Sequence, residues 1–201
     1  MRLFYATRNE SKIVNMRHRL KGYDVDVITP KDVGVYVDVD ETGSSPTENA
    51  QLKARAYYDK TGIATIAGDS GLYIDGIPDE RQPGIFVHRV NGKSLSESEL
   101  IEHYTGLAAE YGGRLKARYV TGLSLIVEGR EYHTEIPDDD MFLVGVPNEN
   151  RQHRGNPLDV ITICPANGKY MNDCSLHELT VLAGSFDRKC LQFLENNLLG
   201  L

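Results

Sequence analysis

The chain has 201 residues, 40% of them hydrophobic and 25% charged, and its formal net charge is −7. This size and composition are typical of a soluble globular protein that buries one sizeable core in one or two lobes. The negative charge excludes a general polyanion binder such as a DNA-coating protein, because such a protein needs a broad basic face to displace counterions. It leaves open one small anionic ligand, held by a few local cations or by a bound metal.

The cysteines and the first residues indicate a compartment. Cys164, Cys174 and Cys190 cannot all pair within the chain, and neither they nor the six histidines follow a zinc-binding spacing. Reduced thiols in a reducing compartment are the simplest interpretation. The start of the chain, MRLFYATRNESK, lacks the apolar region of a signal peptide, and no apolar run approaches the ~18 residues of a membrane-spanning helix. We therefore expect a cytoplasmic protein with no membrane or nucleic-acid partner.

Hydrophobic spacing predicts alternating strands and helices in the first half of the chain. The expected strands are residues 2–6, 23–28, 63–67 and 72–74, and the expected helices are residues 10–20 and 48–60. Pro46 or Thr47 opens the second helix, and Gly62 ends it. After a loop rich in Gly and Pro, a further helix is expected from Ser94 or Ser96 to about Tyr111.

The second half is expected to contain a long hairpin, further strands and closing helices. In order, these are a hairpin of residues 115–127 and 131–136, strands at 143–146 and 158–164, and helix from Ser175 and again toward Leu199. This order predicts an α/β fold, an elongated mixed sheet with flanking helices and a long hairpin lobe. We expect one domain over residues 1–201, with two lobes and a central cleft.

The stretch IAGDSGLYID, residues 66–75, places an acid and a hydroxyl between glycines where two expected strands meet. A turn here would present Asp69 and Ser70 at the end of a sheet. Three interpretations compete: a serine nucleophile, a metal and phosphate site, or an ordinary turn whose acid bonds the local backbone. Gly-Asp-Ser-Gly superficially resembles the serine motif of trypsin-like proteases, which needs a histidine base in reach. Only His18, on an expected helix, precedes Ser70, so we set the nucleophile aside.

Two further stretches favour the metal and phosphate interpretation. The loop from the first strand to the first helix carries groups that attract or hydrogen-bond phosphate, namely Thr7, Asn9 and Lys12. Free backbone N–H groups and the helix dipole also favour an anion there, although capping by Asn9 explains half of this pattern without a ligand. Asp40 and Glu41 lie in a polar loop without an obvious packing role, and with Asp69 they would supply the oxygen ligands that Mg²⁺ prefers.

Four motifs then occur in a characteristic order. They are ATRNESK at residues 6–12, TG at 42–43 with TENA at 47–50 and KA at 53–54, AGDSGL at 67–72, and PGIFVHR at 83–89. Together they resemble the Ham1-like family, the inosine/xanthosine triphosphate pyrophosphatases. The resemblance covers about residues 3–90, and four motifs in register are far more specific than any one of them.

The resemblance implies a function and a set of site residues. Family members hydrolyse noncanonical purine nucleoside triphosphates to the monophosphate and pyrophosphate with Mg²⁺, usually as dimers with an elongated α/β fold and a central cleft. By this resemblance Asp69 is the catalytic acid that binds metal or activates water, and Asp40 or Glu41 assists as a metal ligand. The substrate-binding residues that it implies are Thr7, Asn9, Lys12, Lys53, Ser70, Gly71 and Arg89.

The chain departs from the family pattern in three places. Gly68 replaces the first of two adjacent acids before the Ser-Gly. The base-gripping segment corresponds to residues 155–160, where Asp159 is retained but Asn156 or Leu158 replaces the aromatic ring, and a leucine covers a base by dispersion only. The family's Ser-His-Arg corresponds to SFDR at residues 185–188, which leaves Arg188 as a candidate contact.

Two functional hypotheses follow from this mixture. In the first, the chain is a working Mg²⁺-dependent pyrophosphatase with a changed or loosened base preference, which the retained Lys12, Lys53 and Asp69 favour. In the second, it is a catalytically weak relative that binds a nucleotide or a protein partner, which Gly68 and the altered Ser-His-Arg favour. The resemblance alone makes a homodimer the expected assembly.

Overall fold

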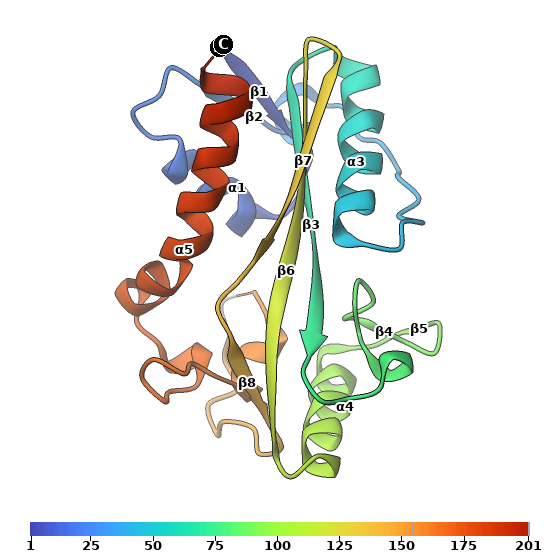
Figure 1. Ribbon diagram of the computed structural model, residues 1–201, viewed down its shortest axis with the longest axis vertical. Helices are drawn as coiled ribbons and strands as arrows, with labels where there is room; N and C mark the ends of the chain where they lie inside the picture. The colour runs from blue at the N-terminus through green and yellow to red at the C-terminus, as the bar shows by residue number, and fades with distance from the viewer. Residues whose placement is uncertain (154, 201) are drawn as a thin grey trace. The chain divides into compact units, whose positions relative to one another are not determined.

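The computed structural model describes residues 1–153 and 155–200 (Figure 1). The chain divides into two compact units, each formed by separate stretches of sequence. Unit 1 consists of Met1–Ser70, Val120–Pro137 and Phe186–Leu201, and unit 2 consists of Gly71–Tyr119 and Asp138–Ser185. Strands β3 (Thr65–Ile74) and β6 (Arg114–Val127) and helix α5 (Leu176–Leu194) each contribute residues to both units.

Unit 1 is built on a mixed sheet. Its elements are β1 (Arg2–Tyr5), α1 (Glu10–Arg19), β2 (Asp26–Ile28), α2 (Pro30–Val33), α3 (Pro46–Thr61), parts of β3 and β6, β7 (Arg130–Pro137), the end of α5 and a closing turn of π-helix (Glu195–Leu199). The strand order is β2-β1-β3-β6, with β7 paired to β6. Strand β1 runs parallel to both β2 and β3, whereas β6 and β7 form an antiparallel hairpin.

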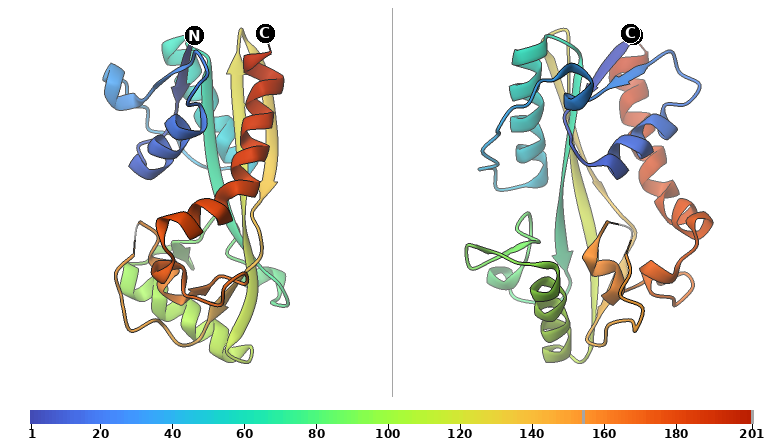
Figure 2. Two further views of the ribbon diagram at one scale, coloured as in Figure 1. Left: turned by 90° about the vertical axis from the view of Figure 1, so that its left-hand side faces the viewer. Right: turned by 180° about the vertical axis from the view of Figure 1, so that it is seen from behind.

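The two faces of the unit 1 sheet are covered by different helices. Because successive strand residues point to opposite faces, Leu3 packs in one core with α1 and α5, whereas Phe4 packs in another with α3. The rings of Phe4 and Tyr57 stack with centroids 5.3 Å apart. Figures 1 and 2 show α3 on one side of the strands and α1 and α5 on the other. Unit 1 therefore has helix, sheet and helix layers.

Unit 2 has its own core around α4. Its further elements are β4 (Arg89–Val90), β5 (Lys93–Ser94), α4 (Glu97–Glu110), β8 (Met141–Val144), β9 (Thr162–Ile163) and 3₁₀ turns at Asp79–Arg81, Pro157–Ile161 and Met171–Asp173. The first part of β6 pairs with β8, and β8 pairs with β9, both antiparallel. Buried residues from these strands and from α4, including Leu100 and Leu143, form one cluster.

Most predicted elements are confirmed, and local chemistry explains their ends. Ser96 caps α4, and it exchanges hydrogen bonds with Glu99 in a capping box. The hairpin turn between β6 and β7 has two residues, Glu128 and Gly129, both with positive φ (50° and 75°). This is the left-handed geometry that two-residue hairpins need to match the strand twist. The predicted α/β class and the long hairpin are therefore present.

The predicted Gly-Asp-Ser-Gly turn is wrong, because residues 65–74 form one continuous strand, β3. Here the glycines allow close packing. A Cβ on Gly68 would lie 3.1 Å from Leu123 Cδ2, and one on Gly71 would lie 2.9 Å from the Gly84 carbonyl oxygen. Glycine inside a strand commonly marks such an approach. Asp69 and Ser70 thus stand on a strand, not at its end.

Two predicted strands are also shorter than expected. The strand at residues 23–28 is reduced to Asp26–Ile28. The strand at 158–164 begins as a 3₁₀ turn, Pro157–Ile161, which Asn156 caps by accepting a hydrogen bond from the Leu158 amide (3.1 Å). Buried apolar runs of this length do not distinguish strand from helical turn by periodicity. Among the described residues, no helix has both the length and the apolar character needed to cross a bilayer.

Candidate functional site

The first part of the site is the entry to α1. Strand β1 ends at Tyr5, and Asn9 caps the helix by accepting a hydrogen bond from the Lys12 amide (3.1 Å). The Thr7 hydroxyl accepts another from the Asn9 amide (3.2 Å). The side chains of Thr7 and Asn9 therefore shape the turn, and the remaining free N–H groups of the first helical turn are directed outward at the helix end. Such an end favours an anion.

The second part is an ion cluster centred on Asp69. Lys53 donates to Asp69 Oδ1 (2.9 Å), and Asn49 Nδ2 donates to Asp69 Oδ2 (3.1 Å). Lys53 also lies 3.4 Å from Glu41. The side chains of Lys53 and Asp69 are only 15% and 17% exposed, so the pair is largely shielded from water but still reachable. Charges in such a setting interact more strongly than surface charges do.

Lys12 brings the two parts together. Burial lowers the pKa of the Lys12 ammonium below its usual 10.5, and the neighbouring Lys53 lowers this pKa further. Asp69 and Glu41 act in the opposite direction. Two lysines and two carboxylates therefore share one region of unit 1, next to the N-terminus of α1. Two desolvated cations that repel each other are an arrangement that a bound anion would relieve.

Ser70 is held by a neighbour that the sequence analysis did not identify. Its hydroxyl lies 2.9 Å from the Thr121 hydroxyl on β6. The adjacent Gly122 lets the start of α3 lie against β6, since a Cβ there would be 2.3 Å from the Thr47 nitrogen. Asn49 was also missed, although the TENA motif contains it. No local pattern in the sequence reveals these three roles, because each depends on strand and helix packing.

The remaining predicted residues lie elsewhere. Gly71, Arg89 and Asp159 belong to unit 2. Arg89 is exposed and lies over the Phe86 ring at 5.8 Å. Arg188 is exposed on α5. Its neighbour Asp187 accepts hydrogen bonds from the buried Arg19.

At the predicted base end, Leu158 and Asn156 differ in what they expose. Leu158 is completely buried in the unit 2 core, so it offers no surface to a base. Asn156 is partly buried, and its Nδ2 lies 3.5 Å from the Tyr119 hydroxyl. Burial raises the pKa of Tyr119 to about 12, so this hydroxyl stays protonated at neutral pH. Among the predicted replacements for the ring, only Asn156 has accessible polar atoms.

The cluster fits a metal only in part. The described residues contain no group of three or more His, Cys, Asp or Glu side chains that could hold an ion. Asp40 is exposed and stands outside the Lys53 network, whereas Glu41 and Asp69 share Lys53. One or two carboxylates are nevertheless the donor set that Mg²⁺ uses when water and substrate phosphates complete its shell. Asp69 and Glu41 suit that shared arrangement, and an all-protein cage is absent from the described residues.

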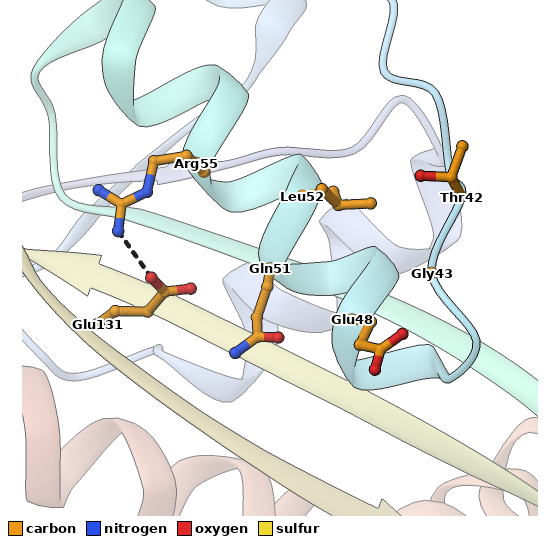
Figure 3. Close-up of a pocket in the computed structure, with 7 residues that line it drawn as sticks. All are labelled: Thr42, Gly43, Glu48, Gln51, Leu52, Arg55 and Glu131. Carbon is orange, nitrogen blue, oxygen red and sulfur yellow. Dashed lines mark hydrogen bonds and ion pairs between the residues drawn. The ribbon is translucent and has the colours of Figure 1, made fainter.

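A cavity of about 540 Å³ lies on a neighbouring face of α3 (Figure 3). Its lining residues are Thr42, Gly43, Glu48, Gln51, Leu52, Arg55 and Glu131. The cation there, Arg55, is already paired with Glu131 at 2.7 Å, and Glu48 adds a second negative charge. A polyphosphate would therefore meet net negative charge in this cavity. The Asp69 cluster, with its two lysines, is the better candidate site.

Comparisons with known proteins point to one family. Residues 3–136 match the Ham1 family. A dITP/XTP pyrophosphatase from Caldanaerobacter subterraneus subsp. tengcongensis is 30% identical over 184 residues, which cover 89% of this chain and 87% of that protein. One from Thermoanaerobacter pseudethanolicus is 29% identical over 135 residues, which span 65% of this chain and 66% of its own length. A Ham1 protein structure from Coxiella burnetii aligns with a TM-score of 0.78 at 23% identity, covering 98% of this chain and 99% of that one.

Proposed function

The chain belongs to the Ham1 family, and from this premise we propose that it is a nucleoside triphosphate pyrophosphatase acting on noncanonical purine nucleotides. Its relatives are named dITP/XTP pyrophosphatases, and such enzymes hydrolyse a phosphoric anhydride bond. The observation that carries the proposal is the cluster of Lys12, Lys53, Glu41 and Asp69 beside the N-terminus of α1. Desolvated cations and a helix end suit a polyphosphate, and a carboxylate among them suits the activation of water.

The chemistry assigns a role to each group. A water molecule attacks the α-phosphorus, the bond from that phosphorus to the α,β-bridging oxygen breaks, and the products are the nucleoside monophosphate and pyrophosphate. Asp69 orients the water and accepts its proton. Lys53 holds Asp69 Oδ1 by a hydrogen bond, and Lys12 together with the N–H groups of α1 balances charge on the phosphates.

We propose Mg²⁺ as the metal, held by Asp69 and Glu41 together with the nucleotide's own oxygens. When bound, it supplies charge neutralisation for the phosphates and the pyrophosphate leaving group. The missing acid at Gly68 leaves this donor set small, which is consistent with a metal that arrives with its nucleotide. The family resemblance also supports the further proposals of a homodimer and of two lobes with a central cleft, and the three free cysteines support that of a cytoplasmic location.

The base preference is proposed to differ from that for inosine and xanthosine. Leu158 is buried and the aromatic ring of the family is missing, so stacking on the base is lost. Asn156 and Asp159 offer hydrogen-bonding groups in its place. A site without a stacking ring discriminates less by shape, so we expect a broader range of accepted bases.

A panel of canonical and noncanonical nucleoside triphosphates, assayed for pyrophosphate with and without Mg²⁺, tests the function. We expect Mg²⁺-dependent release from at least one purine analogue, and a reduction of turnover by about 10²-fold or more in Asp69→Asn, because that variant loses the group that deprotonates water. Nucleotide binding should largely survive in the variant. Release from no member of the panel would favour the second hypothesis, a relative that binds and does not hydrolyse. If Asp69→Asn is about as active as the wild type, Asp69 is not the group that deprotonates the water.

A further inference from the structure

Asn49 is a buried amide with both ends occupied. The residue is only 2% exposed. Its Nδ2 donates to Asp69 Oδ2 at 3.1 Å, and its Oδ1 accepts from the Gly43 backbone N–H at 2.9 Å. A carboxylate accepts and a backbone N–H donates, so these two neighbours leave the amide only one orientation. Buried polar groups are normally paired in this way.

Asn49 and Lys53 together hold both oxygens of Asp69. They stand four residues apart on α3, so their side chains share one face of the helix. Lys53 takes Oδ1 and Asn49 takes Oδ2. Hydrogen bonds from one helix to both oxygens fix the orientation of the carboxylate. The donor to Oδ2 is the neutral amide of Asn49, which adds no charge next to a phosphate.

The other end of Asn49 anchors the loop that carries Glu41. A Cβ on Gly43 would lie 2.7 Å from Glu48 Cβ and 2.8 Å from Asn49 Oδ1, so only glycine lets the loop come this close to α3. Glu41 stands two residues earlier and lies 3.4 Å from Lys53. The same helix face therefore fixes both carboxylates of the cluster.

We propose that Asn49 is a positioning residue that sets the Asp69 carboxylate relative to Glu41, and so fixes where the attacking water meets the nucleotide phosphates. The inference rests on the proposed function and deepens it. Asn49 reaches the reacting atoms only through Asp69. Its loss should therefore lower turnover more than it weakens substrate binding, because misplacement of a catalytic group affects the transition state most.

Two substitutions separate the two ends of the amide. Asn49→Asp keeps an oxygen for the Gly43 N–H but loses the donor to Asp69, whereas Asn49→Ala loses both. We expect kcat to fall by about 10- to 100-fold in each variant, which is typical when a group that orients a site residue is lost. The change in KM should be smaller than the change in kcat. Gln51→Glu is the matched control, since it makes the same amide-to-carboxylate change on α3, where Gln51 contacts His133 and not Asp69. Its kcat should stay within about twofold of the wild type.

Amide hydrogen exchange and side-chain NMR report on the contacts without substrate. Protection of the Gly43 amide should persist in Asn49→Asp and vanish in Asn49→Ala. If Asn49 only anchored the loop, Asn49→Asp would keep both this protection and its kcat. In otherwise wild-type protein, Asp69→Ala should shift the Asn49 side-chain amide resonances.

The outcomes are distinguishable. A loss of kcat in Asn49→Asp with Gly43 still protected and Gln51→Glu unaffected supports the inference. An Asn49→Asp kcat within twofold of the wild type overturns it while the proposed function stands. If the wild type releases no pyrophosphate, the proposed function is wrong. The NMR measurement still tests the contact between Asn49 and Asp69, because side-chain amide resonances of Asn49 that do not shift in Asp69→Ala would show that this contact is absent.

Discussion

Under the proposed function, Lys12 would serve a ligand at the expense of stability. Its ammonium is partly buried beside Lys53, and burial is the main reason why its pKa is lowered. In the absence of an anion, this charge is held in an unfavourable place. Binding sites commonly carry such unfavourable groups, because the ligand compensates them.

We therefore expect Lys12→Met to raise the melting temperature of the unliganded protein at pH 7 by roughly 2–4 °C while weakening nucleotide binding. The sign with pH follows from linkage. At pH values below the lowered folded pKa, the charged form of Lys12 is buried and the whole cost of its burial is present. As pH rises through its lowered folded pKa, the folded form sheds the proton first, and the gap between variant and wild type narrows.

Thermal unfolding of both proteins between pH 7 and pH 10 checks this expectation. Lys21→Met is the control, because Lys21 is an exposed lysine just after α1 and its loss changes the net charge equally. A melting temperature of Lys12→Met below that of the control at pH 7 would contradict the interpretation. So would a gap that widens as the solution becomes alkaline.

At the scale of elements, the contact between α3 and β6 decides the site. Helix α3 supplies Asn49 and Lys53, and its first residues lie against Gly122, where a Cβ would be 2.3 Å from the Thr47 nitrogen and 2.5 Å from the Pro46 carbonyl carbon. These are backbone atoms, so they cannot make room by changing a side-chain rotamer. The glycine on β6 therefore determines how closely the start of α3 approaches β6, the strand next to β3, which carries Asp69.

We expect Gly122→Ala to reduce the free energy of unfolding by about 1–3 kcal/mol, as overpacking does, and to lower pyrophosphate release by moving α3. Urea denaturation measures the first effect. Gly106→Ala in α4 is the matched control, since a Cβ there meets nothing within 4 Å and alanine in an exposed helix should stabilise by about 0.5–1 kcal/mol. If Gly122→Ala unfolds at the same urea concentration as the wild type, the close approach does not constrain the helix.

At the scale of the whole molecule, two neighbouring lysines lie in a protein of net negative charge. The chain carries 22 Lys and Arg against 29 Asp and Glu, yet Lys12 and Lys53 converge in unit 1. Such a charge distribution attracts a small anion at short range and repels a long polyanion at long range.

We accordingly expect no binding of a labelled double-stranded DNA of about 30 base pairs at about 50 mM salt, where non-specific electrostatic binding is strongest. Fluorescence anisotropy measures it, and binding of a fluorescent nucleoside triphosphate with Mg²⁺ by the same sample shows that the protein is competent. DNA binding that weakens steeply with added salt would contradict this expectation and point to a basic face.

The sequence alone determined whatever depends on neighbours along the chain. The caps at Asn9 and Ser96, the hairpin turn at Glu128 and Gly129, and the α/β order follow from local hydrogen bonding and backbone preferences. The motifs in register led us to predict that Asp69 and Lys53 belong to one site, and the two side chains are hydrogen-bonded in the structure.

Tertiary structure decided what depends on partners distant in sequence. Gly68 and Gly71 looked like a turn, but their purpose is close packing against Leu123 and Gly84, which no local pattern records. Asn49 acquires its role only because α3 is packed beside β3, and Asp187 acquires its partner Arg19 only through the packing of α5 on α1. Glycine and short polar residues can adopt several local conformations and hydrogen-bonding roles of similar energy. Contacts with residues distant in sequence determine which of these is adopted.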